Sequence, residues 1–255
     1  MVDLHSHILP GLDDGPRTLE QAIAVCRAAF DDGTRTLVAT PHVNGQYPGV
    51  TAAAIVEATE AVNRALRSAG LDLRVRTGAE VALSRVGELS DLELDRLALG
   101  GGRYVLLELP WTSAASGALA ALGAFAGRGY GIVIAHPERS PMLQRDDTLA
   151  GELVRSGMLC CLDASSLGED ADRHTRTMAW KLLSAGLVHA IASDCHDAVR
   201  RPPHLGSALD RAGLSQAQVD YFTRRGPEAI LEGEAVAPPP PVEGRHRVHW
   251  WKRRR

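Results

Sequence analysis

The chain has 255 residues, of which 45% are hydrophobic, so it can form one large α/β domain or two small ones and is too apolar for a disordered protein. Its formal net charge of −3 gives no indication of a nucleic-acid partner. The four cysteines form no C-x-x-C pair, and no apolar run approaches the roughly 20 residues that span a bilayer, so we expect a reduced, cytoplasmic protein rather than a secreted or membrane protein.

Short apolar runs rich in β-forming residues alternate with longer amphipathic stretches. The expected order is strand 2–4, helix 19–31, strand 36–39, helix 51–69, strand 73–77, strand 104–109, helix 113–128, strand 131–135, helix 147–156, strand 158–162, helix 173–185 and strand 189–192. Thr18 is the expected N-cap of the first helix. This alternation predicts parallel strands with crossover helices, and seven such units suit a closed barrel better than an open sheet, although the pattern is compatible with both.

The expected domain covers residues 1–233. Residues 234–241 read Glu-Ala-Val-Ala-Pro-Pro-Pro-Pro, which cannot continue a helix. We therefore expect residues 234–255 to form a flexible tail that is first Pro-rich and then basic, because residues 245–255 hold six basic residues and no acid. Paired Trp250 and Trp251 beside these charges suit weak contact with an anionic membrane surface, and a solvated, disordered end is the alternative.

The first strand leads into His5-x-His7, with Asp13-Asp14-Gly15 shortly after it. Alternate residues of a strand point the same way, so both histidines can reach one metal ion. Similar side chains follow five other expected strands. Because the C-terminal ends of parallel strands form one rim, five histidines and four acids would converge there: His5, His7, Asp14, His42, Glu80, Glu108, His136, Asp194 and His196.

A single histidine after a strand is usually a capping or core residue, and Glu80 alone could be an ordinary surface acid. Glu108 lies in an apolar run, where an unpartnered carboxylate costs several kcal/mol to bury. The repetition at six strand ends favours a metal site over separate structural roles. Mixed imidazole and carboxylate ligands suit Mn, Fe or Zn, and nine ligands suit two or three ions bridged by a carboxylate such as Glu80. Such sites activate water and hold phosphoryl oxygens.

These motifs resemble a known family. The run from His5 to Gly15, with Thr40-Pro-His42, Gly78-Ala-Glu80, Ala135-His-Pro-Glu-Arg139 and Ala192-Ser-Asp-Cys-His196, is similar to the polymerase-and-histidinol-phosphatase superfamily over residues 1–233. More narrowly, it resembles the bacterial metal-dependent tyrosine-protein phosphatases of capsule and exopolysaccharide synthesis. The resemblance implies a distorted (β/α)₇ barrel, a trinuclear and usually manganese-containing site, and hydrolysis of phosphotyrosine on a bacterial tyrosine kinase by metal-activated water.

The resemblance also implies a role for each ligand. His5, His7, Glu80 and Asp194 would hold one ion, Glu80, Glu108 and His136 a second, and Asp14, His42 and His196 a third. Arg139 and Arg201 match the arginines that hold the phosphate, with Arg200 as a neighbour that could replace Arg201. Asp163 departs from the pattern because an asparagine is expected there, and it would add negative charge near the rim.

Three other interpretations make different predictions. Cys195-x₅-Arg201 has the spacing of cysteine-dependent tyrosine phosphatases, but residues 196–200 lack the glycine that a phosphate loop of backbone amides requires. A phosphoesterase of the same fold could act on a small phosphomonoester such as histidinol phosphate, or on a phosphodiester. A metal-loaded binding module would have no turnover. The sequence does not identify a general acid.

Overall fold

The computed structural model describes residues 1–112, 115–146 and 148–243. Every strand pairing among these residues is parallel. One sheet has the order β1-β2-β4, with bounds Val2–Ser6, Thr36–Ala39 and Arg74–Thr77. The other has the order β3-β5-β6-β7-β8-β9, with bounds His42–Val43, Glu80–Ala82, Tyr104–Glu108, Gly131–Ala135, Leu159–Asp163 and Ala190–Ala192.

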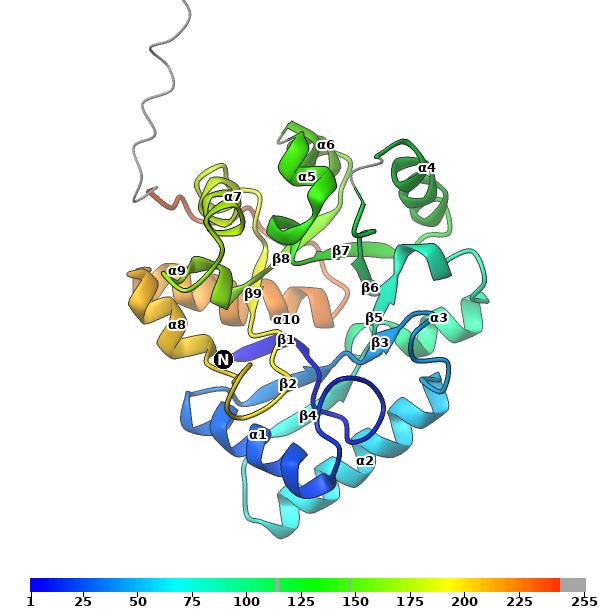
Figure 1. Ribbon diagram of the computed structural model, residues 1–255, viewed down its shortest axis with the longest axis vertical. Coiled ribbons are helices and arrows are strands. Elements are labelled where there is room, and N and C mark those ends of the chain that lie inside the picture. Colours follow the sequence, from blue (N-terminus) through cyan, green and yellow to red (C-terminus); the bar gives the residue numbers. More distant parts are fainter. Residues whose placement is uncertain (113–114, 147, 244–255) are drawn as a thin grey trace, which may run out of the picture.

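Backbone hydrogen bonds join the two sheets at β1. The amide of Asp194 donates to the carbonyl of His5 over 2.9 Å, and the amide of His7 donates to the carbonyl of Cys195 over 2.8 Å. The segment that follows β9 therefore lies beside β1, with a bridge between Ser6 and Cys195. Figure 1 shows the strands at the centre of the molecule and the helices around them, which confirms the parallel α/β architecture expected from the alternation.

The helices expected from the sequence form within one or two residues of the expected bounds. They are α1 (Leu19–Asp31), α2 (Ala52–Ser68), α4 (Ala115–Ala126), α6 (Thr148–Arg155) and α7 (Arg173–Ser184). The Thr18 side chain caps α1 by accepting from the amide of Gln21 over 3.3 Å, as predicted. Residues 113, 114 and 147, where two of the helices were expected to begin, lie outside the described residues.

Several short elements escaped prediction from the sequence. They are β3, β5 and the helices α3 (Asp91–Leu97), α5 (Pro141–Arg145), α8 (Leu205–Ala212), α9 (Gln216–Asp220) and α10 (Gly226–Leu231). Segments of two to eight residues contain too few repeats of an apolar pattern to be recognised by periodicity. The omission of β3 and β5 matters because their first residues are His42 and Glu80.

Helix α10 closes the end of the sheet at which β6 and β9 begin. The Cα of Gly226 lies so close to the strand that an added Cβ would stand 2.2 Å from the carbonyl oxygen of His189, just before β9. The carbonyl of Leu231 approaches Gly102, just before β6, in the same way. Ile230 and Leu231 pack with alternate residues of β1, β6, β7, β8 and β9 in one buried cluster. The C-terminal ends of the strands thus remain the end available for a site.

Residues 234–243, expected to be part of a loose tail, pack against the domain. The Tyr104 hydroxyl donates to the carbonyl of Glu234, the Tyr221 hydroxyl to that of Ala237, and the Gln218 amide to that of Pro241. Val242 is only 8% exposed. The remainder of the expected tail, including Trp250 and Trp251, lies outside the described residues. Within the described part of the chain, no helix is long and apolar enough to cross a bilayer.

We expect a chain that ends at Gly233 to be less stable than one that ends at Glu243. The shorter chain loses the three hydrogen bonds to residues 234–241 and the burial of Val242, which together should lower the free energy of unfolding by about 2–4 kcal/mol. Urea denaturation followed by circular dichroism measures this difference. The chain ending at Glu243 is the matched control, and identical midpoints would show that this segment contributes nothing to stability.

Candidate metal centre

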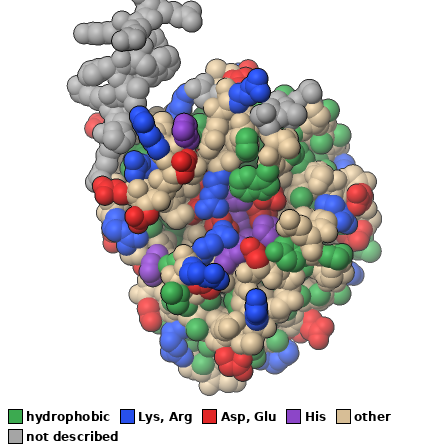
Figure 2. All heavy atoms as spheres, viewed as in Figure 1, with side chains coloured by type: hydrophobic (Ala, Val, Ile, Leu, Met, Phe, Trp, Pro, Cys, Tyr) green, Lys and Arg blue, Asp and Glu red, His purple; other side chains and the backbone are tan. Residues whose placement is uncertain are grey.

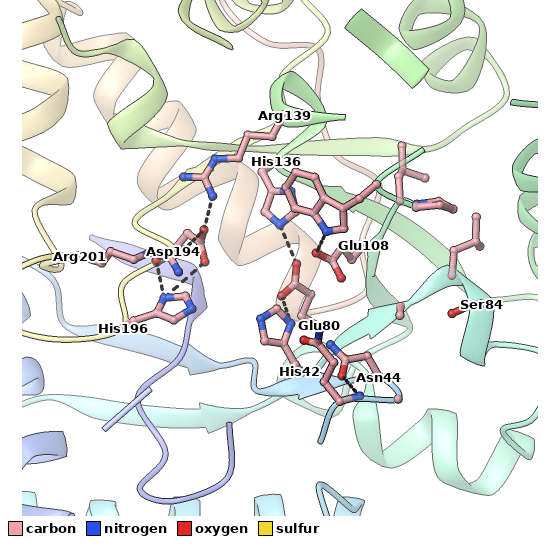
Figure 3. Close-up of a pocket in the computed structure, with 17 residues that line it drawn as sticks. His42, Asn44, Glu80, Ser84, Glu108, His136, Arg139, Asp194, His196 and Arg201 are labelled. Carbon is pink, nitrogen blue, oxygen red and sulfur yellow. Dashed lines mark hydrogen bonds and ion pairs between the residues drawn. The ribbon is translucent and has the colours of Figure 1, made fainter. Parts of the chain in front are cut away.

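The C-terminal ends of the strands surround a cavity of about 570 Å³. Figure 2 shows histidine, acidic and basic side chains gathered in a hollow on this face, and Figure 3 shows the side chains that line it. The lining consists of His42, Asn44, Gly45, Gln46, Glu80, Ala82, Leu83, Ser84, Glu108, Leu109, Pro110, Trp111, His136, Arg139, Asp194, His196 and Arg201. His5 and His7 contact Glu80 and Asp194 from the buried side.

His5, His7 and Glu80 bring their donor atoms together, and Asp194 approaches the two histidines. The Nε2 atoms of His5 and His7 lie 3.1 Å apart. Each lies 3.4 Å from Oε2 of Glu80 and 3.5 Å from Oδ1 of Asp194. An ion held at about 2.1 Å from each of four donors requires neighbouring donors to lie roughly 3.0–3.5 Å apart. The spacing of Nε2 of His5, Nε2 of His7 and Oε2 of Glu80 therefore fits one transition-metal ion, with Asp194 beside the two histidines.

Asp13, which the sequence analysis did not assign to the site, fixes the orientation of His7. Its Oδ2 lies 2.6 Å from Nδ1 of His7 and also accepts the amide of His42 over 3.1 Å, while Oδ1 accepts the amide of Gly15. Because Nδ1 of His7 is held in this way, Nε2 faces the group around Glu80. Gly15 allows the loop to lie this close, since an added Cβ would stand 2.3 Å from the carbonyl oxygen of His7.

A second group of donors consists of Glu80, Glu108 and His42, and His136 contacts Glu80 beside this group. Oε1 of Glu80 lies 2.7 Å from Nε2 of His136, and donor atoms of Glu80, Glu108 and His42 lie within 4.8 Å of one another. Oε1 of Glu108 accepts a hydrogen bond from the indole of Trp111 over 2.8 Å. Burial and the neighbouring Glu80 carboxylate raise the pKa of Glu108. A cation between the two carboxylates would remove this repulsion.

A third group, at the outer side of the site, consists of His7, Asp14, His42 and His196. Oδ1 of Asp14 lies 3.2 Å from Nε2 of His196 and 3.6 Å from Nε2 of His42. Nδ1 of His196 donates to the carbonyl of Asp194 over 2.9 Å, which leaves its Nε2 directed at the group. His42, assigned from the resemblance to this group alone, faces two groups, because its Nδ1 lies 2.8 Å from Oε2 of Glu80.

Some of the donor atoms are buried without a hydrogen-bond partner, as is expected of atoms that bind cations. Oε2 of Glu80, Nδ1 of His42 and Nε2 of His196 are buried and have no hydrogen-bond partner among the described residues. The short approach of His42 to Glu80 thus lacks the alignment of a hydrogen bond. Burial opposes ionisation of Glu80, but His5, His136 and His42 hold its pKa well below the usual range. Unpartnered imidazole nitrogens around a buried carboxylate are the donor set that Mn, Fe and Zn take.

Two of the candidate ligands have unusual backbone conformations. His136 has a φ of 29° and Asp194 a φ of 49°, and no other non-glycine residue among those described has a positive φ. Such conformations cost of order 1–3 kcal/mol each and persist where the surrounding structure enforces them. His136 directly follows β7 and Asp194 closely follows β9, and Figure 3 shows both side chains directed into the cavity. The unusual backbone conformations thus occur at two of the candidate ligands that follow strands.

Arg139 and Arg201 converge on the outer oxygen of Asp194. Nη1 of Arg139 lies 2.8 Å and Nη2 of Arg201 lies 2.7 Å from Oδ2 of Asp194, whose Oδ1 faces the histidines (Figure 3). Nη2 of Arg139 also pairs with Asp163, which is 2% exposed, so the additional negative charge at the rim holds an arginine in place. Arg200 points elsewhere, because its side chain is 89% exposed and lies near Asp197.

Cys195 is a core residue. Its side chain is 0% exposed and belongs to the main hydrophobic cluster, away from the cavity lining. Burial and the nearby Asp3 carboxylate raise the pKa of the thiol well above its usual range. A neutral, inaccessible thiol cannot attack phosphorus, so the spacing of Cys195 and Arg201 does not mark a cysteine-dependent site.

Three comparisons relate this chain to known proteins. The sequence-family model for capsular polysaccharide synthesis, CpsB/CapC, matches residues 1–232. The tyrosine-protein phosphatase YwqE of Bacillus subtilis is 30% identical over 248 residues, which cover 96% of this chain and 98% of that protein. A solved structure also matches, from a study of YwqE of Bacillus subtilis and CpsB of Streptococcus pneumoniae, which are described as metal-dependent tyrosine phosphatases. It superposes with a TM-score of 0.81 at 30% identity, and the match covers 95% of this chain and 100% of that chain.

We expect Asp13→Asn to weaken metal binding. An asparagine amide cannot polarise the His7 imidazole as a carboxylate does, and loss of such an outer partner typically lowers metal affinity about 10–100-fold. Titration of the metal-stripped protein with Mn²⁺, followed by calorimetry, measures the change. Asp72→Asn, an identical change at an exposed position before β4, is the control, and equal affinities of both variants would show that Asp13 does not support the site.

Proposed function

The chain belongs to the CpsB/CapC family of capsular polysaccharide synthesis, and on that premise we propose that it hydrolyses phosphotyrosine in a protein, using bound divalent cations. Family membership confirms the resemblance found in the motifs. The observation that carries the proposal is the position of Arg139 and Arg201, which contact Asp194 on the side opposite the histidine donors. Cation donors and phosphate-binding forks therefore meet in one cavity, which a metalloenzyme acting on a phosphate ester requires.

The residues proposed to hold cations are the nine identified from the sequence. They would hold two or three ions, which we propose to be Mn²⁺, with Fe or Zn as alternatives: His5, His7, Asp14, His42, Glu80, Glu108, His136, Asp194 and His196. When bound, such ions activate water and neutralise phosphate oxygens. Asp13 orients His7, and the carbonyl of Asp194 orients His196, so these rings are directed toward the groups before any cation binds.

The arginines are proposed to bind the phosphate and the charge that develops on it. Arg139 is held on one side by Asp163 and on the other by Asp194. Its side chain is therefore preorganised, and little conformational entropy is lost when a phosphate arrives. Arg201, whose side chain is 41% exposed, approaches the same oxygen of Asp194 from the opposite loop. The two planar groups can each offer a pair of N–H donors to phosphate oxygens.

The depth of the site supports a tyrosyl substrate over a seryl one. Glu80 and Asp194 are 1% and 4% exposed, whereas Trp111 at the cavity wall is 60% exposed. A phosphate that reaches the buried donors therefore needs a long side chain, and a phenyl ring can fill the distance. Leu83, Leu109 and Pro110 with Trp111 supply an apolar wall, and the Trp111 ring stacks on His136 at 5.9 Å.

Finer features also remain proposals. We count β2 with β3 and β4 with β5 as two interrupted strands, which makes the fold a distorted seven-stranded (β/α) barrel with the site at its C-terminal rim. The substrate is proposed to be a phosphorylated tyrosine kinase that controls capsule or exopolysaccharide synthesis in the cytoplasm. The domain boundary near Gly233 and weak membrane contact through the basic end of the tail, from Trp250 to Arg255, stay predictions.

Comparison of three substrates tests the proposal. With added Mn²⁺ we expect turnover of a phosphotyrosyl peptide at least about ten times faster than that of the matched phosphoseryl peptide, because the shorter side chain cannot bring its phosphate to the buried donors. Histidinol phosphate, the small-phosphomonoester alternative, should be a poor substrate. Chelation should abolish turnover. Preferred cleavage of histidinol phosphate would replace the proposed substrate, and absence of turnover on all three would support a binding module.

Cys195→Ser separates the two phosphatase mechanisms. Since the thiol is buried and outside the cavity, the variant should retain phosphotyrosine hydrolysis within about two-fold of the unaltered protein and should stay fully sensitive to chelation. The measurement is kcat/KM on a phosphotyrosyl peptide, with thermal unfolding to confirm that the core tolerates the hydroxyl. Loss of activity in a folded, metal-loaded variant would support the cysteine-dependent mechanism instead.

A further inference from the structure

A second cavity, of about 370 Å³, lies on the other side of the two phosphate-site arginines. It shares Arg139, Arg201 and Asp194 with the cavity that holds the metal ligands. The rest of its wall comes from the segments after β8 and β9 and from α8, which contributes Ala208 and Arg211 from one face. We call this space the arginine cavity.

The arginine cavity has unbalanced positive charge. Among the described residues that line it, four are arginines (Arg139, Arg200, Arg201 and Arg211) and two are carboxylates (Asp163 and Asp194). Both carboxylates are already engaged. Asp163 pairs with Arg139 and accepts from the amide and hydroxyl of Ser165, each over 2.8 Å, and Asp194 binds Arg139 and Arg201.

The remaining two arginines are available to a ligand. Arg200 has one long ion pair, at 3.6 Å between its Nε and Asp197, and its side chain is 89% exposed. Arg211 has no ion pair or side-chain hydrogen bond with any described residue and is exposed on α8. His204 lies in the same wall. A partly enclosed space with one guanidinium group that has no partner among the described residues (Arg211) and one that is only weakly paired (Arg200) favours a carboxylate or phosphate, which these groups bind through paired N–H donors.

The two cavities differ in the ligand that their charges suit. The first is lined by Glu80, Glu108 and Asp194, which suit cations, whereas the free charges of the arginine cavity suit anions. The Arg139 and Arg201 side chains separate the two spaces. A phosphotyrosine bound with its phosphate at these arginines would therefore place neighbouring residues of its peptide beside the arginine cavity.

We propose that the arginine cavity binds an anionic side chain close to the phosphotyrosine in the substrate, and so selects acidic sites. This inference rests on the proposed phosphatase activity and adds a specificity to it. The shared chemistry is a carboxylate or phosphate group on the peptide. Arg211 and Arg200 provide the selectivity, because Arg139 and Arg201 serve the phosphate that is cleaved.

A set of phosphotyrosyl peptides tests the inference. One sequence is made with alanine, glutamate or phosphoserine at each position flanking the phosphotyrosine, and kcat/KM is measured at low salt. We expect the best acidic peptide to exceed its alanine counterpart about five-fold, which is the order expected for a partly exposed ion pair. The preference should fall to about one-fold in Arg211→Ala, invert in Arg211→Glu and largely persist in Arg211→Lys.

Arg27→Ala is the matched control, because Arg27 is exposed on α1, does not line either cavity and has no ion pair with a described residue. It should keep the full preference. A gain with glutamate identifies a carboxylate site, and a gain confined to phosphoserine identifies a site for a second phosphate. Equal rates for all peptides, or a preference that survives Arg211→Glu, would overturn the inference.

Hydrolysis of a small aryl phosphate distinguishes the proposed phosphatase activity from the proposed role of the arginine cavity, because this substrate has no flanking residues. If the metal-loaded protein turns over neither the aryl phosphate nor any peptide, the proposed phosphatase activity itself is wrong. If it turns over both without regard to flanking charge, the phosphatase activity stands and the role of the arginine cavity is refuted.

Discussion

A buried carboxylate, that of Glu80, is the group around which the whole site is arranged. It is 1% exposed, and four histidines approach its two oxygens at distances between 2.7 and 3.4 Å. Burying an ionised carboxylate costs several kcal/mol unless charges or cations compensate it. The histidines lie in or directly after β1, in β3 and directly after β7, so this compensation links three parts of the chain. Oε2 of Glu80 has no hydrogen-bond partner among the described residues, so a cation could provide the remaining compensation.

The pairing of β1 with the segment after β9 makes this arrangement achievable. His5 and Asp194 exchange one backbone hydrogen bond, and Asp3 ties the two segments further by accepting the amides of His5 and Ser193. Asp194 has a left-handed backbone, and its two carboxylate oxygens have different partners. One faces the histidines and the other faces the two arginines, so a single strained residue contacts both the candidate metal donors and the two guanidinium groups.

The arginines also form a boundary between environments of opposite charge. Arg139 is fixed by Asp163, so the acid that departs from the expected asparagine neutralises a guanidinium and holds it in position. Arg200 and Arg211, whose charges are not neutralised in this way, lie on the far side. Two cavities with different charged linings thus share one pair of arginine side chains.

The sequence by itself determined the parallel α/β alternation and the positions of the strand ends that carry histidines and acids. Both follow from local rules, because apolar periodicity marks strands and helices and parallel strands place their C-terminal ends together. Only the tertiary structure decided the short strands at His42 and Glu80, the support of His7 by Asp13, the hold of Asp163 on Arg139 across 24 positions, and the arginine cavity. Such pairings join segments that are far apart in the sequence and come together only when the strands assemble. A local pattern of residues therefore cannot predict them.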